Sequence, residues 1–231
     1  MNITLFGGTF DPPHNAHLTI AHFLIKHQIS DQVWFVPVYK HPWAKRYHKT
    51  ELTPYSHRIN MLNLLISSQR SHSEAKSHEA IESQSHIRKS AQSFSTSKDN
   101  NLSQANALSI KHFRHTSFTY PTIKYFEDKY PKHQFSWVMG SEYIEKFHLF
   151  LKDHPLLANY TFYIYPRQGH PLKNLYTFMT PLKAPLIKVS SSDIRWHLNQ
   201  GKSISTLVPP QVKAYIKENN LYTSTKTPEN N

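Results

Sequence analysis

The chain has 231 residues, enough for one domain with a substantial core, and its complete lack of cysteine excludes disulfides and thiolate chemistry. Its net charge is +12 with the 17 histidines counted as neutral, which fits either a polyanionic partner or a basic solvated surface. The N-terminus lacks the basic start of a signal peptide, and no apolar run approaches the roughly 20 residues that span a bilayer. We therefore expect a cytoplasmic protein with no membrane partner.

The first part of the chain alternates between strand and helix patterns. Residues 3–6 predict a short apolar strand that stops at Gly7-Gly8, and the apolar spacing over 18–25 predicts a buried helix. Residues 33–38, VWFVPV, predict a buried parallel strand. A second helix is expected to begin at Thr53-Pro54, because threonine caps helices and proline suits the first helical position.

The pattern breaks over residues 67–106, which are rich in Ser, His, Gln, Lys and Glu and poor in large apolar residues. Such a segment buries too little surface to offset the entropy lost on ordering it, so we expect a disordered or weakly helical insertion. A tolerated surface insertion and a regulatory or protein-binding loop are both compatible with this composition.

Strand and helix patterns resume after the insertion. Strands are expected at 107–113, 135–139, 161–165 and 186–189, and helices at 120–130, 142–150, 193–199 and 210–220, followed by a polar tail over 223–231. This order predicts an α/β fold: a doubly wound (Rossmann-like) parallel sheet of about five strands, with helices at the C-terminal end of the chain.

The stretch GGTFDPPHNAH, residues 7–17, follows the first strand, where parallel sheets bind their ligands. Two glycines allow a close approach of backbone to ligand, and His14 and His17 lie on one side of the helix that begins there. Imidazoles beside the positive end of a helix suit phosphate oxygens. Two alternatives stay open, a zinc site completed by Asp11 and a histidine that simply packs in the core.

A second motif, VSSSDIR at residues 189–195, lies far along the chain at another predicted helix start. The hydroxyls of Ser190, Ser191 and Ser192 are suited both to capping the helix and to donating to a phosphate. Arg195, one turn into the helix, is suited to a bidentate grip on a phosphate. An ordinary serine cap with a surface arginine is the alternative.

Together the two motifs resemble the two signatures of the HxGH nucleotidylyltransferase superfamily. GGTFDPPHNAH is similar to the HxGH signature, with Ala16 in the usual glycine position, and VSSSDIR is similar to ISSTxIR. Within the superfamily the chain resembles bacterial nicotinate-nucleotide adenylyltransferases. The further similar segments are YKHPWAK at 39–45, Arg58, Ser117-Phe118-Thr119, Gly140-Ser141-Glu142, Arg167-Gln168-Gly169 and the C-terminal segment ending in Leu221-Tyr222.

This resemblance implies one nucleotidylyltransferase domain over 1–222 that contains the 67–106 insertion. It implies that the adenylyl group of ATP is transferred to nicotinate mononucleotide, giving deamido-NAD and pyrophosphate in NAD biosynthesis, with Mg²⁺ bound together with ATP rather than at a metal site of the protein. No specific nucleic acid is expected as a partner, and a homo-oligomer is compatible with the sequence. The implied catalytic residues are His14, His17, Lys45 and Arg195; the implied ATP-binding residues are Gly7, Gly8, Thr9, Phe10, Glu142, Ser190, Ser191 and Ser192; the implied acceptor-binding residues are Thr119, Phe150 and Arg167.

Three positions depart from the family pattern. Glu142 replaces an aspartate, Phe150 stands where the family has a tryptophan, and Ala16 adds a methyl group near the phosphate site. None removes a charged group, but they leave open the choice between nicotinate and nicotinamide mononucleotide. The alternatives are an HxGH transferase that uses phosphopantetheine or forms a CDP-alcohol, and a non-catalytic nucleotide-binding or RNA-binding protein.

Overall fold

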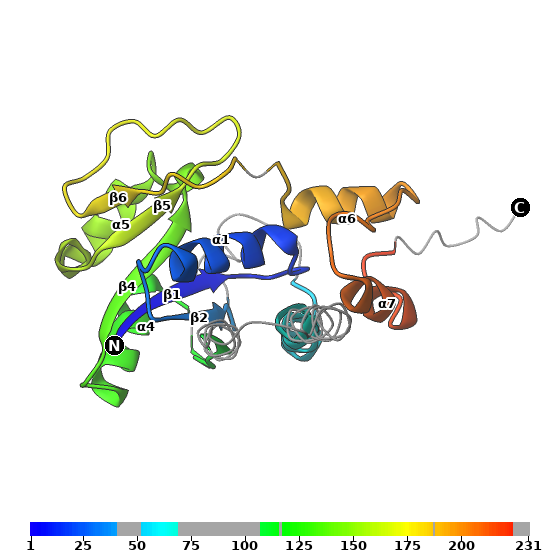
Figure 1. Ribbon diagram of the computed structural model, residues 1–231, viewed down its shortest axis with the longest axis horizontal. Coiled ribbons are helices and arrows are strands. Elements are labelled where there is room, and N and C mark those ends of the chain that lie inside the picture. Colours follow the sequence, from blue (N-terminus) through cyan, green and yellow to red (C-terminus); the bar gives the residue numbers. More distant parts are fainter. Residues whose placement is uncertain (41–51, 69–106, 116, 187, 224–231) are drawn as a thin grey trace, which may run out of the picture.

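The computed structural model describes residues 1–40, 52–68, 107–115, 117–186 and 188–223, and its centre is a six-stranded sheet (Figure 1). Every pair of neighbouring strands is parallel, and the strand order is β3-β2-β1-β4-β5-β6. The strands are β1 (Asn2–Gly8), β2 (Gln32–Pro37), β3 (Leu108–Ile110), β4 (Gln134–Gly140), β5 (Phe162–Tyr165) and β6 (Met179–Pro181). The predicted doubly wound α/β fold is confirmed, with six strands where about five were expected.

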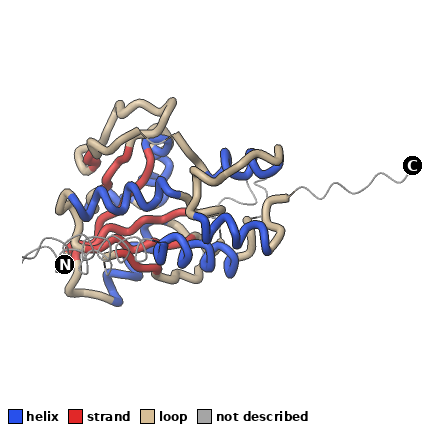
Figure 2. Tube along the Cα trace, turned by 45° about the vertical axis from the view of Figure 1, so that its right-hand side comes forward, coloured by secondary structure: helices blue, strands red, loops and turns tan. Residues whose placement is uncertain are grey.

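Helices cover both faces of the sheet, so that the strands lie in the middle of the molecule (Figure 2). The helices are α1 (Asn15–Lys26), a helix at 55–68, α4 (Thr119–Lys129), α5 (Phe147–Asp153), α6 (Ser191–Asn199) and α7 (Pro210–Glu218), with short 3-10 helices η1 (Ser141–Tyr143) and η2 (Pro155–Asn159). None of the helices in the described ranges is long and apolar enough to cross a bilayer.

The core has two layers because successive strand residues point to opposite faces of the sheet. Phe6 and Phe35 pack in the layer formed with α1, the helix at 55–68, α6 and α7. Leu5 and Trp34, each one residue away, pack in the opposite layer with α4 and α5. The central strands β1 and β2 are therefore apolar on both sides, which explains the continuous apolar runs in their sequences.

The strand expected at 186–189 is wrong, because the sixth strand lies at Met179–Pro181 and the described residues of 186–189 are not in a strand. Met179 is buried against the sheet opposite Phe162, whereas Leu186 is 49% exposed. A three-residue edge strand gives too short a pattern to distinguish from an apolar loop.

Three other boundaries differ from those expected. The strand at 107–113 is limited to Leu108–Ile110, and the helix at 142–150 is divided into η1 and α5. Ser67 and Ser68, expected to begin the insertion, belong to the helix at 55–68, where their hydroxyls donate to Leu64 O and Leu65 O. Residues 69–106 of the insertion and 224–231 of the tail lie outside the described residues.

Candidate active site

The sheet changes direction between β1 and β4, since the chain builds outward from β1 on one side and from β4 on the other. Ligands of doubly wound sheets bind beyond the carboxyl ends of the strands at this point. Gly7 and Gly8 end β1, and Gly140 ends β4. The carboxyl ends of these two central strands therefore mark the place where the predicted site residues should meet.

The glycines of β1 have a packing role that the sequence did not predict. A Cβ on Gly7 would overlap the ring of Trp137, and one on Gly8 would lie 3.0 Å from the ring of Phe10. Phe10 itself has a φ of 48° and is buried against Phe6 and Phe35. The space beside both glycines is thus occupied by aromatic rings of the protein, whereas we had expected it to admit a ligand.

The two histidines of the first motif form a stacked pair at the start of α1. Their ring centroids are 3.8 Å apart, and His14 is 3% exposed. The backbone N–H of His14 donates to His17 Nδ1 at 3.0 Å, which leaves the ring proton of neutral His17 on Nε2. Phe10 packs against the His17 ring with centroids 4.9 Å apart. His17 is therefore held in one orientation with Nε2–H as its remaining donor.

Both rings are kept neutral by their surroundings. Burial and the Arg167 guanidinium lower the pKa of His14 from 6.5 to about 3. The pKa of His17 is lowered by burial first, and then by His14 and by Arg167. Among the described residues, His14 Nδ1 has no hydrogen-bond partner although it is buried. The pair is thus a set of neutral polar groups beside a positive charge, at the positive end of a helix.

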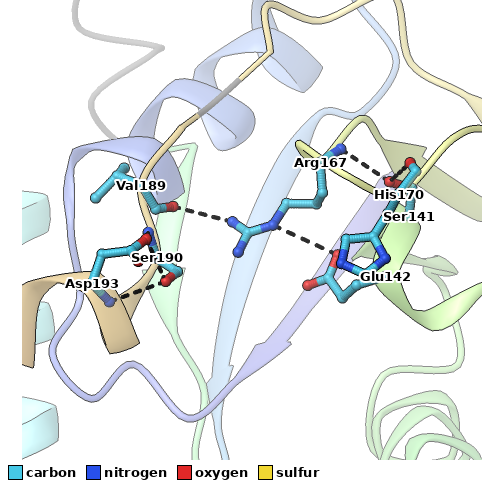
Figure 3. Close-up of polar contacts among 7 residues, drawn as sticks. All are labelled: Ser141, Glu142, Arg167, His170, Val189, Ser190 and Asp193. Carbon is cyan, nitrogen blue, oxygen red and sulfur yellow. Dashed lines mark hydrogen bonds and ion pairs between the residues drawn. The ribbon is translucent and has the colours of Figure 1, made fainter. Parts of the chain in front are cut away.

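Arg167 joins the segments that follow β4 and β5 to the start of α6 (Figure 3). Its Nε lies 3.7 Å from Glu142 Oε2, and its Nη1 donates to Val189 O at 3.1 Å. Its backbone N–H donates to Ser141 Oγ, which in turn donates to His170 O. A Cβ on Gly140 would overlap the Glu142 carboxylate, so glycine is what allows this carboxylate to fold back toward Arg167.

The second motif forms the start of α6 and contacts the first. Ser190 and Asp193 cap each other's backbone N–H groups, at 3.2 and 2.8 Å. Ser191 Oγ donates to Pro12 O at 2.8 Å, and Arg195 Nη1 donates to Asp11 O at 2.5 Å. The two motifs, far apart in sequence, are therefore brought into direct contact, as the convergence of both on one edge predicted.

Arg195 and the serines have protein partners of their own in this arrangement. Arg195 Nη2 donates to Ser192 Oγ at 3.1 Å. A guanidinium has five N–H donors, and these two contacts leave others for a phosphate. The serine-cap alternative is correct for Ser190. Arg195 differs from an ordinary surface arginine because it donates a hydrogen bond to Asp11 O, in the loop that precedes α1.

The expected acceptor residues are spread over different elements. Thr119 is the first residue of α4, and Phe150 lies on α5 with its ring stacked on Phe147, centroids 5.5 Å apart. Arg167, the third expected acceptor residue, lowers the pKa of the two histidines through its charge. Lys45 lies outside the described residues.

A cavity of about 500 Å³ opens beside Arg167, within the size range of small-molecule sites. It lies between the segment after β5 and the start of α6. Its lining consists of Arg167, Gln168, Lys188, Val189, Ser190, Asp193, Trp196, His197 and Leu207. The exposed Trp196 and the basic side chains give it both a stacking surface and positive charge.

The described part of the chain contains no group of three or more His, Asp or Glu side chains that could hold a metal ion. The zinc alternative also lacks its third ligand, because the Asp11 carboxylate accepts hydrogen bonds from Tyr222 OH at 2.6 Å and Thr53 N at 3.1 Å.

Sequence reasoning assigned no role to Arg58, Asp193 or Tyr222. Arg58 is 1% exposed and donates to Thr9 O and Thr53 O, each at 2.8 Å. The Ser-x-x-Asp spacing of a reciprocal cap was the signal for Asp193. No local pattern marks Tyr222, because its partner Asp11 lies 211 residues earlier in the chain.

Comparison with known proteins agrees with this site. Residues 5–196 match the family model described as cytidylyltransferase-like. The nicotinate-nucleotide adenylyltransferase of Bacillus subtilis is 29% identical over 222 residues, covering 96% of this chain and 98% of the relative. A protein of Bacillus pumilus, named a probable nicotinate-nucleotide adenylyltransferase, is 30% identical over 225 residues, covering 96% of this chain and 98% of the relative.

A solved structure supports the fold. The nicotinic acid mononucleotide adenylyltransferase of Plasmodium falciparum, complexed with NaAD, superposes with a TM-score of 0.69 at 20% identity, covering 96% of this chain and 97% of the other. The family model matches residues 5–196, and relatives are similar to the chain over nearly their whole length. The chain therefore belongs to the cytidylyltransferase-like nucleotidyltransferases, in the family of nicotinate-nucleotide adenylyltransferases.

Proposed function

We propose that the chain transfers the adenylyl group of ATP to nicotinate mononucleotide, releasing pyrophosphate and forming deamido-NAD. Its family membership supports this activity. The observation that carries it is the pair of neutral, stacked histidines at the start of α1, flanked by Arg167 from beyond β5 and by α6 with Arg195. Such a cluster of donors and positive charge fits a polyphosphate whose charge is redistributed during the reaction.

The reaction needs no nucleophile from the protein. A phosphate oxygen of the acceptor attacks the α-phosphorus of ATP as the bond to the bridging oxygen breaks, and pyrophosphate leaves with that electron pair. Catalysis of such a step is mostly positioning and charge stabilisation. His17 Nε2–H, fixed by the contact at Nδ1, is the donor that we assign to the α-phosphate oxygens.

Arg195 and Arg167 supply the positive charge in this proposal. Arg195 has donors left for the outer phosphates, and Arg167 lies between the histidines and the cavity. We propose that the cavity takes part of the ATP molecule, since Ser190 and Arg167 both line it. Lys45 keeps its predicted role at the outer phosphates.

The remaining ATP contacts are proposed for the backbone around Gly7, Gly8, Thr9 and Phe10, for Glu142, and for Ser190, Ser191 and Ser192. Thr119, Phe150 and Arg167 are proposed for the acceptor. Nucleotidyltransferases of this kind use a divalent cation, for which we propose Mg²⁺. The Asp11 carboxylate accepts hydrogen bonds from the protein and the Glu142 carboxylate is paired with Arg167, so phosphate oxygens and water would hold the ion, which would neutralise phosphate charge.

Three further proposals rest on the sequence. A single domain over 1–222, with an insertion after the helix at 55–68, accounts for coverage of 96% of the chain by a relative that is itself covered to 98%. We propose nicotinate mononucleotide as the preferred acceptor, rather than the nicotinamide form, because the similar proteins are nicotinate-nucleotide adenylyltransferases. A cytoplasmic location is proposed because the chain contains no cysteine, as is common in reducing compartments.

A substrate panel tests the proposed function. Purified protein with ATP and Mg²⁺ is given nicotinate mononucleotide, nicotinamide mononucleotide or phosphopantetheine, and product and pyrophosphate are quantified. Deamido-NAD and pyrophosphate in equal amounts are expected with the first acceptor. Turnover of phosphopantetheine alone, or binding of ATP without any turnover, would replace the proposal by one of the two alternative functions.

A further inference from the structure

The loop that carries His14, residues 9–14, is held by side chains from separate parts of the chain. Three of its carbonyl oxygens each accept a side-chain hydrogen bond: Thr9 O from Arg58, Asp11 O from Arg195 and Pro12 O from Ser191. The next residue, Asn15, donates its backbone N–H to Leu207 O at 3.0 Å. The conformation of this loop therefore depends on contacts made far from it in the sequence.

Asp11 is the one charged residue of this loop, and it is 4% exposed. A buried carboxylate must be hydrogen bonded, and each of its oxygens has a donor: Thr53 N at Oδ2 and Tyr222 OH at Oδ1. The Tyr222 contact, at 2.6 Å, is the shorter of the two. Burial and the Asp11 carboxylate raise the pKa of Tyr222, so its phenol remains a protonated donor at neutral pH.

Asp11 also connects this contact to the candidate active site. Its carbonyl oxygen accepts from Arg195 Nη1, while its carboxylate accepts from Tyr222. A shift of the carboxylate would rotate the residue and move the carbonyl that orients the Arg195 guanidinium. The same residue lies three positions before His14, which begins α1.

We propose that Tyr222 is a positioning residue, whose hydroxyl holds Asp11 so that the loop orients His14 and Arg195 toward the triphosphate of ATP. This proposal rests on the proposed function and adds to it a residue that contacts no substrate. Under this proposal, a residue in the segment that follows α7 sets the orientation of the side chains that bind the phosphates.

Tyr215 provides a matched control. Its hydroxyl lies 2.9 Å from both His57 Nδ1 and Asn60 Nδ2, and so joins α7 to the helix at 55–68 without touching the loop. Replacing either tyrosine by phenylalanine removes one hydroxyl and keeps the ring. A merely structural role would give the two variants the same phenotype.

The test compares wild type, Tyr222→Phe and Tyr215→Phe in steady-state kinetics and thermal denaturation. For Tyr222→Phe we expect kcat/KM for ATP to fall about 10- to 100-fold, the range for a lost hydrogen bond to a charged group. Its KM for nicotinate mononucleotide should stay within about twofold of wild type. For Tyr215→Phe both kinetic constants should stay within about twofold. Equal kcat/KM for ATP in the two variants would overturn the proposal.

A second comparison uses Asp11→Asn alone and together with Tyr222→Phe. If both act through one contact, the double variant should lose no more than about twofold beyond the larger single loss. Fully multiplicative losses would overturn the proposal.

If wild-type protein forms no dinucleotide, the proposed function fails, and the role of Tyr222 is then read from the Kd for ATP by calorimetry. Weaker binding by Tyr222→Phe, with Tyr215→Phe unchanged, would support it; equal Kd values would overturn it.

Discussion

Replacing Gly140 by alanine should break one ion pair of the candidate active site. The new methyl group would overlap the Glu142 carboxylate, which is the free end of a flexible side chain and can turn away. Its displacement breaks the ion pair with Arg167, in which Oε2 and Nε are 3.7 Å apart. Arg167 would then keep only Val189 O as the partner of its guanidinium group among the contacts drawn in Figure 3.

The magnitude follows from the geometry of that pair. At an effective dielectric constant of about 20, the Coulomb attraction across this distance is about 4 kcal/mol before desolvation. The two side chains are 27% and 20% exposed, and solvent and desolvation reduce the net contribution to about 1–2 kcal/mol. Lost as transition-state stabilisation, this corresponds to a fall in kcat/KM of about 5- to 30-fold.

The assay measures kcat/KM for ATP at saturating nicotinate mononucleotide, together with thermal denaturation. For Gly140→Ala we expect that loss of activity together with a fall in melting temperature of about 3–7 °C, because the same ion pair also stabilises the folded protein. Glu142→Gln, which keeps the size of the side chain, should show a similar fall in kcat/KM for ATP. The double variant should show a fall only slightly larger than that of either single variant. Full activity of Gly140→Ala would refute the role assigned to the ion pair.

Three other predictions follow from buried contacts. Gly7→Ala places a methyl against the rigid Trp137 ring, so overpacking of about 1–3 kcal/mol should lower the melting temperature by about 3–10 °C. Folding depresses the pKa of His14 from 6.5 to about 3, so below pH 6.5 the unfolded chain binds a proton that the folded chain does not. The free energy of unfolding therefore decreases as the pH is lowered. At pH 5 this costs about 2 kcal/mol, so His14→Asn should lose less stability than wild type between pH 7 and 5 in denaturant titrations. Arg58→Lys cannot reproduce the fork that binds two carbonyls, and urea titration should show a loss of about 2 kcal/mol; an unchanged midpoint would contradict that role.

The fold was predictable from the sequence because its strands are buried on both faces. Their continuous apolar runs and the intervening helical patterns predict the parallel sheet, and Gly140 correctly marks the end of β4. The edge strand at Met179–Pro181 was not predictable, since three residues carry no period. The helix expected at 142–150 failed because η1 bends the chain where Ser141 bonds to the segment after β5.

Contacts within a single motif were predictable from the spacing of its residues. Contacts between residues far apart in the sequence were not. The histidine spacing predicted a paired arrangement, and the pair is stacked. The neutral state of the pair comes mainly from burial and then from the charge of Arg167, which lies beyond β5, and no local pattern shows either. The contact between Asp11 and Tyr222 is hidden for the same reason.

His17 donates the hydrogen bond that the proposed mechanism assigns to the α-phosphate, so its replacement by alanine is the most direct test. The single-turnover rate of deamido-NAD formation from ATP and nicotinate mononucleotide isolates the chemical step. Loss of the oriented Nε2–H donor should lower that rate at least about 100-fold, equivalent to about 3 kcal/mol of transition-state stabilisation. His27→Ala, at the exposed other end of the same helix, should retain the wild-type rate. A folded His17→Ala protein with a rate within about threefold of wild type would contradict the assignment of this chemistry to the histidine pair.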